Sequence, residues 1–268
     1  MTGEPIAGDS IPRGHDAVRV FEGASAVRLR GRLRARTHQD PATGVPLRRK
    51  APAMNDDEVW AAIDSERRRT AGLLEQLSDD EWAQPSLCDG WTVRDVAAHL
   101  TLQQLTVGDC VRMVLRHPGP LNSMICAAAR RRAALPTDRL IADLRATIGS
   151  RRRNVGLTSL EPLSDILVHG QDIAIPLHRD LEMPVTAAAA AATRVWSFGG
   201  RGKARVFRSL PLRGYRLTAT DVEWSAGEGP EIRGPISAIL LLLTGRRVAL
   251  PLVSGPGADE LRARLPAG

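Results

Sequence analysis

Apolar residues recur every three or four positions after residue 54, and this spacing predicts a series of amphipathic helices. The first should begin after Asn55, an N-cap residue followed by three acids in the first turn, where the helix dipole favours negative charge. The second should begin after Thr92, because Asp95 follows three residues later in a capping-box arrangement. This second helix is predicted to run to about Leu115.

Two further segments continue the helical pattern. A third helix is predicted over 137–148, after a more variable stretch at 123–134, and a fourth over 161–175, ending near Pro176. Four long amphipathic helices with modest connections are typical of an up-and-down four-helix bundle, whose facing helices can hold a metal site in the core.

The pattern changes in the last third of the chain. An Ala-rich helix is predicted from Pro184 to about Trp196, and short alternating runs separated by glycine-rich turns then predict strands. The predicted strands are 215–220, 222–225 and 231–233, and the predicted helices are 235–244 and 258–264. We therefore expect an α+β protein with a helical bundle over 54–195 and a small α/β C-terminal domain over 196–268.

The amino-acid composition indicates a globular protein and does not by itself indicate a function. Apolar residues make up 43% of the chain, as is usual for a soluble globular protein. The longest run of large apolar residues, 239–243, is too short to span a bilayer, and no secretory signal pattern is visible. Cys88, Cys110 and Cys126 lack CxxC spacing, which argues against a zinc ribbon or a disulfide scaffold and predicts a cytoplasmic protein.

The net charge of +7 could suggest nucleic-acid binding, but its position weakens that interpretation. Residues 1–53 hold ten basic and five acidic residues, so they carry +5, and the other 215 residues carry only +2. A basic tail on a nearly neutral body is not a basic groove, and we expect neither a nucleic-acid nor a membrane partner. We expect residues 1–53 to be mostly disordered, with translation starting at Met54 as an alternative.

The candidate chemistry lies in the fourth predicted helix. Asp165, His169 and Asp172 are spaced by four and three residues, so they lie on one face among apolar neighbours. A bound metal is one way to satisfy such polar groups, and an ordinary Asp–His pair on a half-exposed helix is the other. His99 lies on the apolar face of the second helix, where a histidine is more often a core residue than a ligand.

Three segments together resemble the maleylpyruvate isomerase family of mycothiol-dependent enzymes. The first extends from Glu66 through Trp82 and Pro85 to a Cys-Asp-Gly-Trp-Thr-Val-Arg-Asp-Val-Ala-Ala-His-Leu run at 88–100. The second is Val-His-Gly-Gln-Asp-Ile at 168–173, and the third extends from the Thr-Ala-Thr-Asp of 218–221 to the Leu-Leu-Leu-Leu-Thr-Gly-Arg of 240–246. The resemblance covers about residue 55 to the end of the chain and implies a DinB-like metal-binding four-helix bundle followed by a small α/β domain.

The resemblance implies a divalent metal, usually zinc, held by His99, Asp165 and His169. Two imidazoles and one carboxylate suit a catalytic zinc, which keeps a fourth position open. Better-known family members have Glu in place of Asp165, and the shorter Asp is expected to bind either directly at a longer reach or through water. Asp172 is then expected as an acceptor for a ring N–H or as an extra ligand.

The family also implies a function. The thiol of mycothiol would occupy the open metal position as a thiolate and add to a small electrophilic substrate, giving addition, transfer or cis–trans isomerisation. Arg246 is the candidate for holding a substrate carboxylate, although it also suits the end of a helix as a simple cation. No His or acid partner is evident for Cys88. The alternative is a non-catalytic protein that binds a metal or a small ligand.

Overall fold

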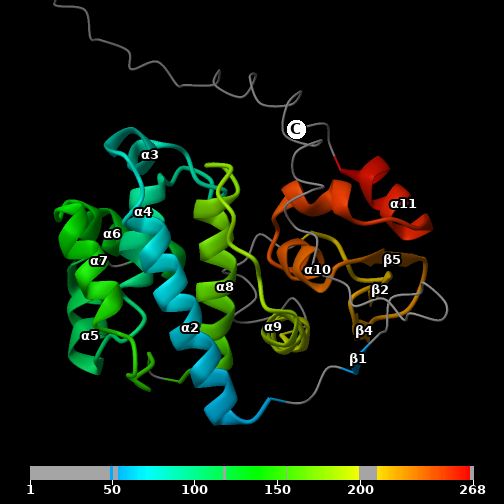
Figure 1. The fold of residues 1–268 in the computed structure, drawn as a ribbon, viewed down its shortest axis with the longest axis horizontal. Coiled ribbons are helices and arrows are strands. Elements are labelled where there is room, and N and C mark those ends of the chain that lie inside the picture. The colour runs from blue at the N-terminus through cyan, green and yellow to red at the C-terminus, as the bar shows by residue number, and fades with distance from the viewer. Residues whose placement is uncertain (1–48, 51–53, 117–118, 155, 199–209, 266–268) are drawn as a thin grey trace, which may run out of the picture.

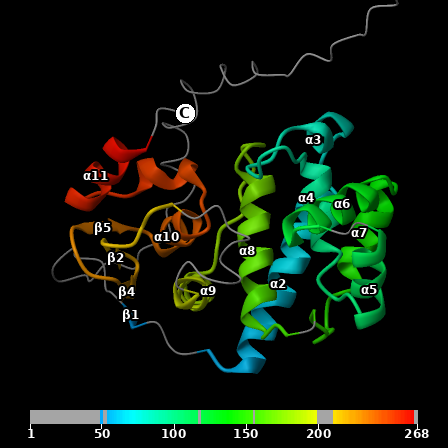
Figure 2. The ribbon, with the colours of Figure 1, turned by 180° about the vertical axis from the view of Figure 1, so that it is seen from behind.

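The computed structural model describes residues 49–50, 54–116, 119–154, 156–198 and 210–265. Its first part is helical, and α2 and α8 lie side by side along its length (Figures 1 and 2). The start of one is tied to the start of the other by a 2.6 Å hydrogen bond from Ser159 Oγ to Asp56 Oδ1. The helices are α2 (Asp56–Leu74), α3 (Asp79–Ala83), α4 (Val93–Leu100), α5 (Val107–Arg116), α6 (Leu121–Ala133), α7 (Thr137–Arg145) and α8 (Leu160–Ala174).

The predicted helix starts are confirmed. The Asn55 side chain accepts from the backbone N–H of Glu58, whose carboxylate accepts in return from the Asn55 backbone, and α2 begins at the next residue. Thr92 and Asp95 form the same reciprocal arrangement at the start of α4. Each box satisfies two backbone donors that a helix leaves unpaired at its first turn, so the local sequence alone places these starts.

The predicted end of the second helix is wrong. We expected one helix from Thr92 to about Leu115, but α4 ends at Leu100, residues 101–104 form turns, and α5 begins at Val107. The apolar periodicity continues through this break, which is why the pattern predicted a single helix.

Two sets of hydrogen bonds stabilise the break. The Asn154 side chain accepts from the backbone N–H of Leu105 at 2.7 Å and donates to the carbonyl of Leu102 at 3.3 Å. Thr106 and Asp109 then form a further capping box, with backbone–side-chain bonds of 3.0 and 3.2 Å. The Thr-x-x-Asp spacing was visible in the sequence, but the distant Asn154 was not.

The C-terminal part confirms the α+β class. Strand β2 pairs with β5 in parallel and with β4 antiparallel, giving a three-stranded sheet in the order β4-β2-β5. The predicted strand at 222–225 is two short strands, because the chain turns at Trp224. The elements are α9 (Val185–Ser197), β2 (Arg216–Ala219), β3 (Val222–Glu223), β4 (Ser225–Ala226), β5 (Glu231–Gly234), α10 (Ile236–Leu243), the 3₁₀ helix η2 (Arg247–Leu252) and α11 (Pro256–Arg264).

The Ala-rich helix α9 connects the two parts. It packs against α8 on one side and against α10 on the other (Figure 1). Its alanines belong to an apolar core that runs from α2 and α8 to the sheet and α10, and a second apolar core lies within the helical part. The C-terminal elements are therefore held against α8 by shared burial, and a domain boundary at residue 195 stays a prediction.

Most of the predicted disordered tail lies outside the described residues. Within it the structure describes only β1 (Arg49–Lys50), which pairs in parallel with Val222 and Glu223 of β3. No helix in the described parts of the chain is long and apolar enough to cross a membrane.

Two glycines give a matched test of this fold. Gly229 has a φ of +115°, and a Cβ there would lie 2.0 Å from the carbonyl oxygen of Gly214, whereas a Cβ on Gly72 in α2 meets nothing within 4 Å. We expect Gly229→Ala to lower the free energy of unfolding by more than about 1 kcal/mol, and Gly72→Ala to raise it by about 0.5–1 kcal/mol. Urea unfolding measures both, and equal stability of the two variants would contradict the described turn.

Candidate functional site

The structure brings together two of the predicted ligands from different helices. His99 of α4 and His169 of α8 have ring centroids 4.8 Å apart and meet edge to face at 77°. Trp91 contacts His99 from the side, with centroids 5.4 Å apart. The imidazole pair therefore lies between α4 and α8.

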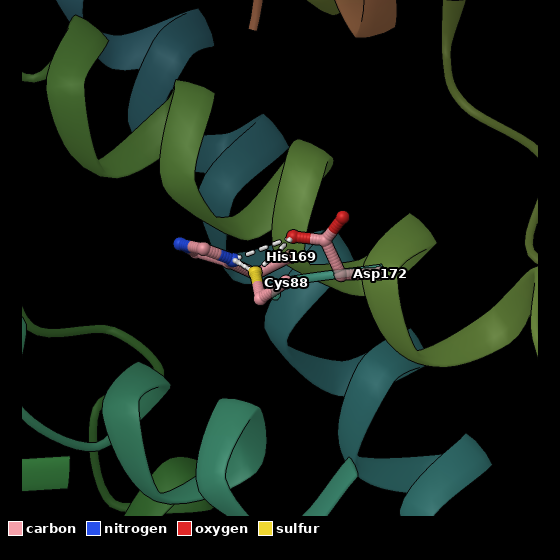
Figure 3. Close-up of side chains that lie close together, drawn as sticks. All are labelled: Cys88, His169 and Asp172. Atoms are coloured by element: carbon pink, nitrogen blue, oxygen red, sulfur yellow. Dashed lines mark hydrogen bonds and ion pairs between the residues drawn. The ribbon is translucent and has the colours of Figure 1, made fainter. Parts of the chain in front are cut away.

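Asp172 lies beside this pair and is fully buried. Its Oδ2 accepts from His169 Nδ1 at 2.8 Å and from the thiol of Cys88 at 3.1 Å. Figure 3 shows that the other ring nitrogen of His169 points away from Asp172. The carboxylate thus accepts a hydrogen bond from the Nδ1–H of His169 and leaves Nε2 as the ring atom that can bind another group.

Arg246 reaches the same carboxylate from the C-terminal part of the chain. Its Nε donates to Asp172 Oδ1 at 2.9 Å and its Nη2 to Oδ2 at 2.6 Å, a two-pronged contact that matches the planar carboxylate. The Arg246 side chain is 11% exposed and that of Asp172 is not exposed. Because the guanidinium is already bound to Asp172, its predicted role with a substrate carboxylate stays a prediction.

Cys88 corrects a second expectation. We saw no partner for its thiol in the sequence, but Sγ donates to Asp172 and lies 3.8 Å from His169 Nδ1 and 3.5 Å from Arg246 Nη2. Nothing in the local sequence around Cys88 signals contacts with residues 81 to 158 positions away.

A backbone hydrogen bond explains how Cys88 arrives there. The carbonyl of Asp172 would normally accept from the residue four positions later, but that residue is Pro176, which has no N–H. The backbone N–H of Leu87 takes the place at 3.2 Å and fixes the loop before α4 against the end of α8. The proline was visible in the sequence, but the identity of the substitute donor was not.

Asp165 lies one turn before His169 on α8 and is partly exposed. Burial raises the pKa of its carboxyl, and the neighbouring charges of His169 and Arg246 oppose that rise. Within the described residues no protein group donates a hydrogen bond to it. Its oxygens therefore need water or a cation as a partner when the carboxylate is ionised.

The two histidines carry opposite pKa shifts. Burial, with the adjacent His169 adding to it, lowers the pKa of His99 to about 3. Burial also acts to lower the pKa of His169, but its hydrogen bonds with Asp172 and Cys88 outweigh it and raise this pKa to about 10. Burial would raise the pKa of Asp172, but His169 and Arg246 hold it well below the usual range. The site thus contains one neutral imidazole and one imidazole that donates to a carboxylate.

The donor groups fit a divalent cation. His99 Nδ1 is buried and has no hydrogen-bond partner among the described residues, which is costly for a polar atom unless something binds it. By chemistry alone, two imidazoles and the carboxylate of Asp165 would be a nitrogen, nitrogen and oxygen set suited to zinc, and the described contacts join the two imidazoles.

Another group of ligand atoms lies close by. One atom each from Cys88, His169 and Asp172 lie within 4.8 Å of one another, so these residues could also hold a metal ion. The Arg246 guanidinium is in contact with two of them and would repel a cation placed there. Arg246 therefore opposes a metal ion at these three residues, and the set of His99, Asp165 and His169 stays a prediction.

A separate cavity of about 450 Å³ lies away from the histidines. It is lined by Gln104, Leu105, Thr106, Arg151, Arg152, Arg153, Asn154, Gly156 and Leu157. None of the candidate ligands contributes to its wall, so the cavity does not form part of this site.

Comparison with known proteins bears on the same region. Residues 63–162 match the model of the mycothiol maleylpyruvate isomerase N-terminal domain, and this segment contains Cys88 and His99. The match covers 100 of the 268 residues and shows that this segment resembles the N-terminal domain of that family. A search of curated proteins found no match.

Two solved structures have a similar fold. They are a mycothiol-dependent maleylpyruvate isomerase and a histidine-to-alanine mutant of such an enzyme, with TM-scores of 0.54 and 0.53. In each case the alignment covers 78% of this chain and 96% of the other at 14% sequence identity. At that identity the match shows the fold, and the α+β assignment with a DinB-like bundle is confirmed.

The histidine shifts give a test in the metal-free protein. Both histidines have pKa values near 6.5 when unfolded. The protonated state of His169 therefore contributes stability fully below about pH 6.5, and this contribution is lost as the pH rises towards about 10. The neutral state of His99 costs stability as the pH falls from about 6.5 towards about 3, because the unfolded chain takes up that proton first.

An NMR titration of the imidazole signals, assigned with His99→Gln and His169→Gln, checks both shifts. We expect His99 to stay neutral at pH 5 and His169 to stay protonated at pH 8. Two histidines that both titrate near pH 6.5 would contradict the described contacts.

Proposed function

We propose that the chain is a divalent-metal-dependent enzyme that uses mycothiol as a thiol cosubstrate. The reaction would be addition, transfer or cis–trans isomerisation on a small electrophilic substrate. The observation that carries this proposal is the buried, unpartnered Nδ1 of His99, which lies on a ring in contact with His169. The similarity of residues 63–162 to a mycothiol maleylpyruvate isomerase domain supports mycothiol as the thiol cosubstrate.

In this proposal His99, Asp165 and His169 hold the metal, and zinc is the ion best suited to two imidazoles and a carboxylate. A metal bound there would make a coordinated thiol lose its proton at neutral pH. The chain's own groups prepare the site. Burial keeps His99 neutral, and Asp172 accepts a hydrogen bond from the Nδ1–H of His169, so Nε2 of His169 would bind a metal once its own proton was displaced.

We also propose that the enzyme acts in the cytoplasm with small-molecule partners. Cys88 and Cys126 are free thiols, which agrees with a reducing compartment. The basic residues of the tail lie almost wholly outside the described part, and we propose no nucleic-acid or membrane partner.

Metal analysis followed by a thiol assay tests the function. We expect the purified full chain to contain close to one divalent ion and to accelerate mycothiol addition to, or isomerisation of, small electrophiles such as maleylpyruvate. Chelation should abolish the acceleration and zinc should restore it. His99→Ala should weaken metal binding by more than the roughly 10- to 100-fold expected for an outer partner.

The outcomes separate the parts of the proposal. A chain that binds metal but does not accelerate any thiol reaction would be a non-catalytic metal-binding protein. If no metal binds, and His99→Ala changes neither metal content nor melting temperature, the metal site itself is wrong.

Asp165 offers a sharper test of the ligand set. We expect Asp165→Asn to weaken zinc binding, while Asp165→Glu, which keeps the charge and has the family's longer side chain, retains it. The metal-free Asp165→Asn protein should be at least as stable as the unaltered chain, because burial raises the pKa of this carboxyl and so disfavours its charged form.

Competition with a chromogenic chelator gives the zinc affinities, and thermal unfolding of the metal-free proteins gives their stabilities. Unchanged zinc affinity in Asp165→Asn would exclude Asp165 as a ligand.

A further inference from the structure

The carboxylate of Asp172 joins three parts of the chain at one point. It accepts from His169 on its own helix, from Cys88 in the loop before α4, and from Arg246 after α10. Arg246 alone contacts both carboxylate oxygens, at 2.9 and 2.6 Å. A carboxylate held at both oxygens cannot rotate freely, so Arg246 determines the plane in which Asp172 meets the imidazole.

The backbone around Arg246 is well suited to hold it in place. α10 ends in a Schellman arrangement, in which the backbone N–H of Gly245 donates to Leu242 and that of Arg246 donates to Leu241, at 3.0 and 2.8 Å. Gly245 has a φ of +89°, a conformation that favours glycine. The guanidinium also donates from Nη1 to the carbonyl of Thr244 at 2.5 Å, so its direction is set by its own helix end.

We propose that Arg246 is a positioning residue for the metal ligand His169 and acts through Asp172. The C-terminal part of the chain thereby orients an imidazole of the helical part. Arg246 holds the carboxylate, the carboxylate accepts a hydrogen bond from the Nδ1–H of His169, and Nε2 of His169 is left for the metal once its proton is displaced. This inference rests on the proposed metal site but differs from the expectation that Arg246 binds substrate. The Cys88 thiol, on the same oxygen, supports the carboxylate from a third side.

The physical basis is the directionality of an imidazole ligand. A metal-binding histidine needs its other nitrogen protonated and its ring held in one orientation, and loss of the outer carboxylate partner commonly costs 10- to 100-fold in metal affinity. Asp172 has no solvent exposure, so water cannot easily replace the guanidinium if Arg246 is removed. Loss of Arg246 should therefore weaken metal binding, although Arg246 itself would not contact the metal.

A double-mutant cycle on zinc affinity tests the inference. We expect Arg246→Met and Asp172→Asn each to weaken zinc binding by about 10-fold or more, as measured by chelator competition on the full chain. If Arg246 acts through Asp172, adding Arg246→Met to the Asp172→Asn variant should cause little further loss. Since the double variant leaves no buried unpaired carboxylate, it also covers the case in which Arg246→Met alone folds poorly.

Arg179→Met is the matched control. Arg179 also donates through Nε and Nη2 to a carboxylate, here to the single oxygen Oε1 of Glu81 at 3.1 and 2.7 Å, and this pair shares no hydrogen bond with the two histidines among the described residues. Zinc affinity of this variant should stay within about twofold of that of the unaltered chain, because a partly exposed ion pair contributes little to stability. In a ¹⁵N NMR spectrum of the histidine rings, Arg246→Met should shift the His169 signals and Arg179→Met should not.

Each outcome supports or overturns a different statement. Losses from Arg246→Met and Asp172→Asn that simply add, or unchanged zinc affinity in Arg246→Met, would overturn the positioning role. Coupled losses in a chain that accelerates no thiol reaction would support the positioning role and overturn the proposed catalysis. A chain that binds no zinc at all would overturn both.

Discussion

The buried carboxylate of Asp172 is the group on which the rest of the site depends. A negative charge without solvent contact is stable only if donors surround it, and here the donors come from α8, from the loop before α4 and from the end of α10. Its backbone carbonyl adds a fourth connection, to Leu87, because Pro176 cannot supply the usual helical donor. One residue therefore ties the helical part, a loop and the C-terminal part together.

The apolar packing allows this polar arrangement to be specific. α9 fills the space between α8 and α10 with small alanine side chains, so the C-terminal elements lie close to the bundle and share its core. Close packing leaves few alternative positions for the segment that carries Arg246. Burial of this shared apolar core stabilises the contact between the two parts, and the ion pair of Arg246 with Asp172 adds direction to it.

Several buried polar groups of the helical part have no hydrogen-bond partner among the described residues. His99 Nδ1, the amide of Gln103 and the hydroxyl of Thr70 are buried and have no partner among the described residues. Each such atom costs free energy unless water or a ligand binds it. The lowered pKa of His99 keeps that ring neutral, so it can accept a hydrogen bond or bind a metal.

Local sequence determined the parts of the fold that depend on neighbouring residues. The capping boxes at Asn55 and Thr92, the amphipathic helices, the β-strand region and the glycine end of α10 follow from spacing and backbone preference alone. The candidate ligands Asp165 and His169 could be placed on one helical face for the same reason.

Only the tertiary structure showed that α4 ends at Leu100, because the stabilising side chain, Asn154, is about fifty residues away. The tertiary structure also decided the partners of Cys88, and it showed that Arg246 binds Asp172. These contacts join residues 74 to 158 positions apart. They depend on how the helices pack, and no periodicity in the sequence indicates them.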